Sequence, residues 1–295
     1  MSTETEQRDQ IVSTAIREIS HIATLPEVTL KIIELVEDPQ STASDLHKVI
    51  STDPALSSRI LKVVNSSFYG LPGQIASINR AIVLLGLNAV KNIAIAASLS
   101  KLFRGGDLTS NFGAKDLWDH SNSCAAACKI ISDTLKIGIA DEAFLAGLMH
   151  DIGIMIEMQY DRKKLIEVIE TLSVNSKGVP LMDMLEIEDS IFGANHQNFG
   201  AALCEKWKFP RGLTIVTGNH HNPMDVDTDS RTLPSVVYVA DRLVGEMKTN
   251  PYRLDLVQTD MDQAVLEYLK LDEATLEMIR GRVDKSSSDI GSMGD

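Results

Sequence analysis

Helical periodicity runs through most of this chain and leaves little of it for a β-sheet. Stretches such as SSRILKVV (57–64), EAFLAGLM (142–149) and SVVYVADRLV (235–244) bring apolar residues back at spacings of three and four, whereas the alternation of a half-buried strand is hard to find. Stop signals, among them Gly70 and Pro210, close several of these runs. The sequence therefore predicts an all-α fold.

The chain is long enough for one large domain or two smaller ones. It has 295 residues, of which 44% are hydrophobic and 23% are charged, and such a chain can bury a sizeable core. Two adjacent glycines, Gly105 and Gly106, mark a soft boundary. We expect two helical lobes, at 1–105 and 106–280, and then a mobile tail at 281–295 that is mostly small and polar.

Composition argues against two classes of partner. The formal net charge is −13 and no cluster of Lys and Arg is present, so we expect no nucleic-acid binding. The apolar run at 76–99 contains Arg80, Asn88 and Lys91, so we expect no membrane span. An odd number of cysteines and an N-terminus unlike a signal peptide fit reduced thiols in the cytoplasm. Cys124 and Cys128, without a second thiol pair, fit core packing better than a zinc site.

A histidine and an aspartate, His150 and Asp151, stand together in the apolar run LAGLMHDIGIMIE (145–157). Charged residues are rarely fully buried without a partner or a metal. Other expected helices offer further imidazoles and carboxylates; the candidate metal ligands are Asp116, His120, His150, Asp151, His196, His220, His221 and Asp241. Such groups on apolar helical faces suit a divalent metal inside a bundle, with Fe, Mn or Zn as one ion or two.

Most of these residues also have a purely structural interpretation. His150 and Asp151 can form a buried polar pair whose hydrogen bonds tie helices together. Asp116 lies near an expected helix start, where an acid interacts favourably with the helix dipole. Asp241 can pair with a nearby basic residue such as Arg242.

The adjacent pair His220-His221 bears on the number of ions. Neighbouring residues of a helix point about 100° apart. Both imidazoles can therefore be ligands only at a wide centre, such as two metals about 3.5–4 Å apart. With a single ion or none, one of the two would face solvent.

The pattern His…His-Asp…Asp, with GLMHDIG at its centre, resembles the HD superfamily of metal-dependent phosphohydrolases. The first half of the chain narrows the resemblance, because LPEVTLKIIELVEDPQSTASDLHKVISTDPALSSRILKVVNSSFYG is similar to the opening of the HDOD family. The similarity continues through GANHQNFGAALCEKWKFPRGL, NHH and VADRL and spans residues 20–245. It implies a helical N-terminal lobe, an HD-like helical second lobe, and a place in bacterial signalling and regulation.

The chain also resembles the HD-GYP relatives, which hydrolyse cyclic di-GMP. It retains their metal ligands but lacks the residues with which they bind substrate. The eight candidate ligands fall at liganding places, with Asp151 able to bridge two metals. Ile154 stands where those enzymes carry a lysine that helps to hold phosphate. After His220-His221 the chain reads NPMDVDTD, where they carry an acid and a Gly-Tyr-Pro motif.

Two functions follow from these observations. The first is an HDOD regulatory module that acts through contacts with an unidentified signalling protein and whose metal centre is either structural or merely inherited. The second is a metal-dependent phosphohydrolase, in which Asp151 would bridge the metals and be the catalytic carboxylate. The missing lysine and Gly-Tyr-Pro motif favour the first. Phe68 and Tyr69 would allow self-association on an exposed surface, although a packed loop whose rings fill the core is the favoured interpretation of that segment.

Overall fold

The structure, a computed structural model, confirms the all-α prediction. It describes residues 3–19, 26–66, 68–100, 102–103, 106–109, 112–175, 179–247 and 254–290. The helices of the first half are α1 (Thr3–Glu18), α2 (Glu27–Glu37), α3 (Ala43–Ile50), α4 (Pro54–Val64), α5 (Ile78–Leu85) and α6 (Leu87–Leu99). Two short antiparallel strands, β1 (Asp107–Thr109) and β2 (Phe112–Gly113), follow.

The second half is longer and is also helical. Its helices are α7 (Ala114–Leu135), α8 (Ala140–Met149), α9 (Ile152–Tyr160), α10 (Arg162–Leu172), α11 (Met184–Phe192), α12 (His196–Lys206), α13 (Arg211–Asn219), α14 (Thr232–Gly245), α15 (Gln263–Leu269) and α16 (Glu273–Ile290). Short 3-10 turns at Pro223–Asp225 and Thr228–Ser230 connect α13 to α14.

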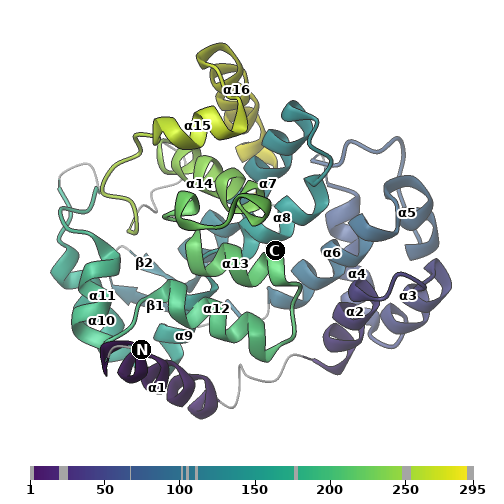
Figure 1. Cartoon of the computed structure of the whole chain (residues 1–295). Coiled ribbons are helices and arrows are strands. Elements are labelled where there is room, and N and C mark those ends of the chain that lie inside the picture. Colours follow the sequence, from purple (N-terminus) through teal and green to yellow (C-terminus); the bar gives the residue numbers. More distant parts are fainter. Residues whose placement is uncertain are drawn as a thin grey trace.

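Local sequence explains how the helices of the first lobe begin. Thr42 and Asp45 form a capping box at the start of α3. Asp53 accepts the backbone N–H of Leu56 and precedes a proline at the first position of α4, where a missing N–H costs nothing. These helices pack around α6, which is buried almost all round and also contacts α8. Figure 1 shows α2–α6 grouped on one side of the molecule, with α6 facing the second lobe.

The core of the second lobe forms around α7, which contacts α8, α14 and α16. Glycines permit two close approaches there. A Cβ atom at Gly147 would lie 2.7 Å from the carbonyl oxygen of Cys124, and one at Gly153 would lie 1.8 Å from the carbonyl oxygen of His196. The first approach brings α8 against α7, and the second brings α9 against the start of α12.

The first helix packs with the second lobe rather than with its neighbours in sequence. Helix α1 contacts α12 and α9, and it buries an apolar face that includes Val12, Ala15 and Ile16. Lys206 Nζ donates to the carbonyl oxygen of Ile16 across this contact at 2.8 Å. The first lobe, which we expected to be 1–105, is therefore formed by α2–α6. Gly105 at the expected boundary lies outside the described residues.

The expected mobile tail at 281–295 is helical through residue 290. Helix α16 continues to Ile290 because Leu276, Ile279 and Val283 recur at helical spacing and are buried. Arg282 Nη1 also donates to Thr134 Oγ1 of α7 at 2.6 Å. Residues 291–295 of the expected tail lie outside the described part of the chain.

The aromatic pair after α4 lies between the two lobes. The rings of Phe68 and Tyr69 meet edge to face with their centroids 5.2 Å apart, and Phe68 lies 6.1 Å from Phe144 of α8. Both rings are half-buried against the core, as in the favoured interpretation of this segment. Within the described residues, no helix is long and apolar enough to cross a bilayer.

Candidate metal centre

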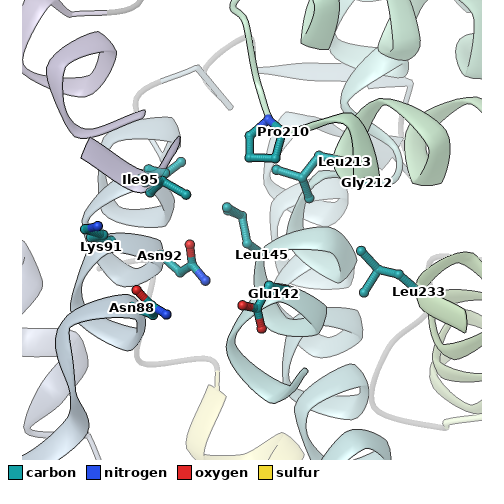
Figure 2. A pocket seen from close by; sticks show the side chains of 11 residues that line it. Asn88, Lys91, Asn92, Ile95, Glu142, Leu145, Pro210, Gly212, Leu213 and Leu233 are labelled. Atoms are coloured by element: carbon teal, nitrogen blue, oxygen red, sulfur yellow. The ribbon is translucent and has the colours of Figure 1, made fainter. Parts of the chain in front are cut away.

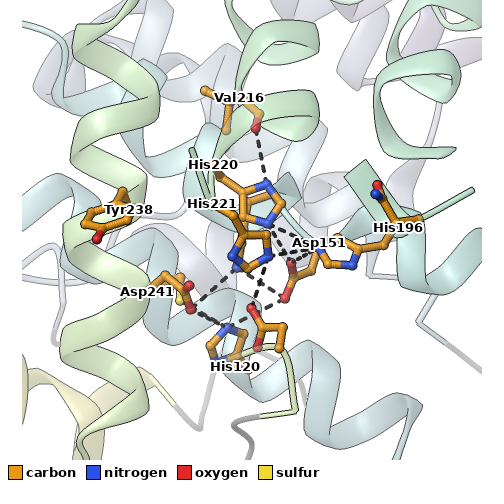
Figure 3. A network of polar contacts seen from close by, with 12 residues as sticks. His120, Asp151, His196, Val216, His220, His221, Tyr238 and Asp241 are labelled. Atoms are coloured by element: carbon orange, nitrogen blue, oxygen red, sulfur yellow. Dashed lines mark hydrogen bonds and ion pairs between the residues drawn. The ribbon is translucent and has the colours of Figure 1, made fainter. Parts of the chain in front are cut away.

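Helix ends position most of the candidate ligands. His150 caps the C-terminus of α8, and Asp151 directly precedes α9 without capping it through its side chain. His196 is the first residue of α12, and His220 caps the C-terminus of α13. His120 and Asp241 project from the middles of α7 and α14. Figure 3 shows the side chains of His120, Asp151, His196, His220 and Asp241 directed toward one another from separate helices and helix ends.

The carboxylate of Asp151 lies at the centre of the cluster and faces two groups of imidazoles. Its Oδ2 atom is 3.2 Å from His150 Nε2 and 3.8 Å from His120 Nε2. Its Oδ1 atom is 3.3 Å from His220 Nε2 and 3.8 Å from His196 Nε2. A carboxylate placed in this way can bridge two cations, one on each side.

The groups on the two sides differ in composition. On one side, Asp241 Oδ1 lies 3.2 Å from His120 Nε2 and 3.9 Å from His150 Nε2. On the other, His196 Nε2 lies 3.4 Å from His220 Nε2 and 3.1 Å from His221 Nε2. Tetrahedral bonds of about 2.0–2.1 Å to a metal would separate two nitrogens by about 3.3 Å. The spacing of these imidazoles therefore fits ligands of a common ion.

Hydrogen bonds at the far side of three rings fix which nitrogen points inward. His150 Nδ1 lies 2.8 Å from the carbonyl oxygen of Gly147, and His220 Nδ1 lies 3.3 Å from that of Val216. His196 Nδ1 lies 2.8 Å from a carboxylate oxygen of Glu188, a buried residue of α11. Each acceptor draws the proton to Nδ1, so the neutral ring presents the lone pair of Nε2 to the cluster. This is the form that binds metal.

Sequence reasoning missed one carboxylate of the cluster, that of Asp255. It comes from the segment after α14, its side chain is fully buried, and its Oδ2 lies 3.7 Å from His221 Nε2. Its oxygens also approach the ligand atoms of His120 and Asp151 within 4.8 Å. Burial and the charges of Asp241 and Asp151 raise the pKa of Asp255 well above its usual value. The signal available in the sequence was its place between two leucines in an otherwise polar segment.

The structure does not bring Asp116 to the cluster. Its Oδ2 accepts the backbone N–H of Gly113 at 2.8 Å, which caps the N-terminus of α7. Asp116 therefore lies at a helix start, as in its purely structural interpretation. Cys124, one turn after His120, lies with its Sγ 3.4 Å from His120 Nε2, and burial raises its pKa well above that of an ordinary thiol. Without a metal it is a neutral thiol, and its Sγ lies within 4.8 Å of ligand atoms of His120, His150 and Asp241.

The buried groups shift one another's proton affinities. Burial lowers the pKa of His150, but the carboxylates of Asp151, Asp241 and Asp255 together outweigh it and raise this pKa to about 10. Burial also opposes protonation of His196, yet the carboxylates of Glu188, Asp151 and Asp255 together raise its pKa to about 9. For His220 burial prevails and lowers the pKa to about 4. Without a cation, His150 and His196 therefore hold protons at neutral pH, and His220 is neutral.

Unsatisfied oxygens indicate what the cluster lacks. The carboxylate oxygens of Asp151, Asp241 and Asp255 are buried, and none makes a hydrogen bond with a described residue. Buried acceptors without partners are rare in proteins, and buried charges are normally paired or bound to metal. Five imidazoles and three carboxylates form a donor set that fits one or two divalent cations. Such a cation would supply positive charge in place of the protons that His150 and His196 hold without it.

Metal binding is expected to tighten as the pH rises from 7 to 9. An imidazole must lose its proton to bind a metal, and the pKa values of about 10 for His150 and about 9 for His196 keep both protonated at pH 7. Each displaced proton raises the apparent affinity by about tenfold per pH unit. Competition with a chelator of known proton affinity measures this slope. An affinity that does not change with pH would contradict the protonation of both rings.

A pocket of about 400 Å³ reaches the edge of the cluster from outside. His221 and Asp255 lie at its inner end, and Arg242 lies on its wall. The guanidinium carbon of Arg242 is 3.4 Å from the centroid of the Tyr238 ring, so the ring supports the cation. Ile154, at the place of the phosphate-binding lysine of HD-GYP enzymes, is fully buried in α9 and presents no polar group to the pocket.

Comparison with known families identifies the chain. A model of the HDOD domain matches residues 22–223, which is more than half of the sequence, and the protein therefore belongs to the HDOD family. An uncharacterized protein of Treponema pallidum (strain Nichols) is 23% identical over 239 residues. The match covers 81% of this chain and 45% of the relative, so the chain spans less than half of that protein's length.

Solved structures show the same fold. A candidate signal transduction protein from Marinobacter aquaeolei VT8 matches with a TM-score of 0.79 and 23% identity, covering 100% of this chain and 67% of its own. A candidate phosphohydrolase from Shewanella amazonensis SB2B matches with a TM-score of 0.74 and 20% identity, covering 96% of this chain and 97% of its own. An HDOD protein of unknown function from Geobacter sulfurreducens matches with a TM-score of 0.70 and 21% identity, covering 95% of this chain and 98% of its own. At these identities the similarity establishes the fold alone.

Proposed function

We propose that this protein is a bacterial regulatory HDOD module, in which a buried divalent metal centre stabilises the second lobe and the module acts through contacts with a signalling protein. We place this role in the cytoplasm. The family supports the general assignment, and the name of the Marinobacter relative points in the same direction. A role without a substrate is in keeping with Ile154 at the place of the phosphate-binding lysine.

The position of Asp255 carries the proposal. Structural metal sites are closed by protein ligands, whereas catalytic sites keep one position open to water or substrate. Seven of the eight clustered side chains are 0–1% exposed, and only that of His221 reaches 8%. Asp255 lies against His221 at this more exposed edge. An ion held here would have protein ligands on the side from which a substrate would approach.

Metal analysis with paired histidine variants tests the proposal. Protein purified without chelator is expected to contain one or two equivalents of a divalent metal, and His150→Ala is expected to lose most of it. His47→Ala is the matched control, because His47 lies on α3 of the other lobe and the contact of its ring within the described part of the chain is with Ser51 of the same lobe. Wild-type protein that contains no metal, or equal metal in both variants, would contradict the metal centre.

The pocket beside His221 favours a second candidate, a metal-dependent phosphohydrolase. One or two cations would supply Lewis-acid charge at its inner end, Asp151 would bridge them, and Arg242 could bind a phosphate oxygen. Hydrolysis of bis(p-nitrophenyl) phosphate separates the two functions. Turnover that His150→Ala abolishes and His47→Ala preserves would replace the regulatory proposal, whereas metal-loaded protein without turnover supports it.

A further inference from the structure

A second cavity lies between the two lobes, apart from the metal centre. It has a volume of about 170 Å³. Figure 2 shows α6 of the first lobe on one side of it and residues of α8 and α13 on the other. Its apolar lining includes Val36 and Ile95 from the first lobe and Leu145, Leu213 and Leu233 from the second. An occupant of this space would contact both lobes at once.

One polar side chain of the cavity wall, that of Asn92, faces the space. Asn92 of α6 is 6% exposed, and its amide makes no hydrogen bond with any residue that the structure describes. Figure 2 shows the amide directed into the space between α6 and Leu145. Asn92 therefore presents a donor and an acceptor to whatever fills the cavity.

The charges around the cavity disfavour an anion. Lys91 belongs to the lining, but its ammonium group donates to Ser41 Oγ at 2.5 Å and to the carbonyl oxygen of Leu35, on the side of α2. Glu142 lies at the exposed rim, and no ion pair with a described residue neutralises it. A cationic or neutral head group is therefore favoured at this end.

We propose that the interlobe cavity binds a small amphiphile with a hydrocarbon body and a neutral or cationic head group that hydrogen-bonds to Asn92. A cavity of about 150 Å³ lined by apolar side chains accommodates benzene, so a single ring or a short branched chain fits the space. The aliphatic lining would contact the hydrocarbon body of the ligand, and the rim with Glu142 would bind its head group. This ligand class is chosen by the lining and does not depend on the metal centre.

The cavity and the metal centre share three helices. Leu145 lies on α8, which ends at His150; Leu213 lies on α13, which ends at His220; and Leu233 lies on α14, which carries Asp241. A ligand that changes the packing of these helices would change the geometry of the cluster. Any such coupling must be reciprocal, so metal would change the affinity for the amphiphile by the same factor.

Titration with two matched probes tests the cavity. Benzylamine, a cation at neutral pH, is expected to bind the full-length protein with a dissociation constant of about 1 mM or tighter. Benzoate, with the same ring and the opposite charge, is expected to bind at least tenfold more weakly. Asn92→Leu should weaken benzylamine at least tenfold. Circular dichroism should show that this variant is as helical as the wild type, so that the loss of binding reports on the Asn92 amide.

Asn122→Leu is the matched control. Asn122 is 5% exposed on α7, lies outside the cavity lining, and donates to the carbonyl oxygen of Trp118. This variant should lower the melting temperature and leave benzylamine binding unchanged. Leu233→Phe, which fills the half-exposed rim, provides a second test and should also weaken benzylamine. No binding of benzylamine at about 10 mM, or equal binding by wild type and Asn92→Leu, would overturn the proposal and leave a cavity that holds water alone.

Discussion

Replacing Gly153 by alanine is expected to destabilise the protein by at least about 3 kcal/mol and to weaken metal binding at least tenfold. The added Cβ atom would lie 1.8 Å from the carbonyl oxygen of His196. Both partners are backbone segments of packed helices, so the clash cannot be relieved by rotating a side chain. Helices α9 and α12 must separate, and His196 and Asp151 move with them. Thermal unfolding and metal content measure the two effects.

Gly281→Ala is the control for this substitution. Gly281 lies within α16, and a Cβ atom there would meet nothing within 4 Å. Alanine favours a helix over glycine by about 0.5–1 kcal/mol, so this variant should be slightly more stable and should keep its metal. If both variants unfold at the same temperature as the wild type, the close contact between α9 and α12 does not exist in solution.

The fold was predictable because its determinants are local. Caps such as Asp53 and the apolar spacing of Leu56, Ile60 and Val64 lie within single helices, and periodicity alone identifies such segments. The location of α1 was not predictable in this way. Its apolar face shows that it is buried, but the face carries no information about which lobe covers it. The length of α16 was missed because small polar residues after 284 conceal a helix that earlier residues hold against α7.

The candidate site also contains residues that the sequence identified and one residue that only the folded chain reveals. The residues around GLMHDIG were found through the resemblance to a family, and the structure brings seven of the eight candidates together. Asp116 is absent from that group because a free backbone N–H at Gly113, three residues away, is a nearer partner than the cluster. Asp255 was missed for the opposite reason. Its role depends on how the segment after α14 folds back over His221, and nothing within that segment fixes this path.

Removing the metal is expected to lower the melting temperature by about 10 °C. A ligand that binds only the folded protein, at a free concentration of 1,000 times its dissociation constant, stabilises it by about 4 kcal/mol, and for a chain of this size about 1 kcal/mol corresponds to 2–4 °C. The physical source is the set of buried carboxylate oxygens that lose their cation. Scanning calorimetry of the metal-loaded and chelated protein measures the difference.

Asp255→Asn shows whether the carboxylate that closes the site takes part in this stabilisation. Because the pKa of Asp255 is raised in the folded protein, its ionisation opposes folding, and its cost grows as the pH rises from the unfolded pKa toward the folded one. Chelated Asp255→Asn should therefore melt above the chelated wild type at pH 7. The metal-loaded variant should melt below the metal-loaded wild type, because it lacks an anionic ligand.

Asp260→Asn, which changes an exposed neighbour in the same segment, is the control and should alter the melting temperature of neither form. Equal shifts in the two forms of Asp255→Asn would mean that Asp255 covers the cluster without binding the metal.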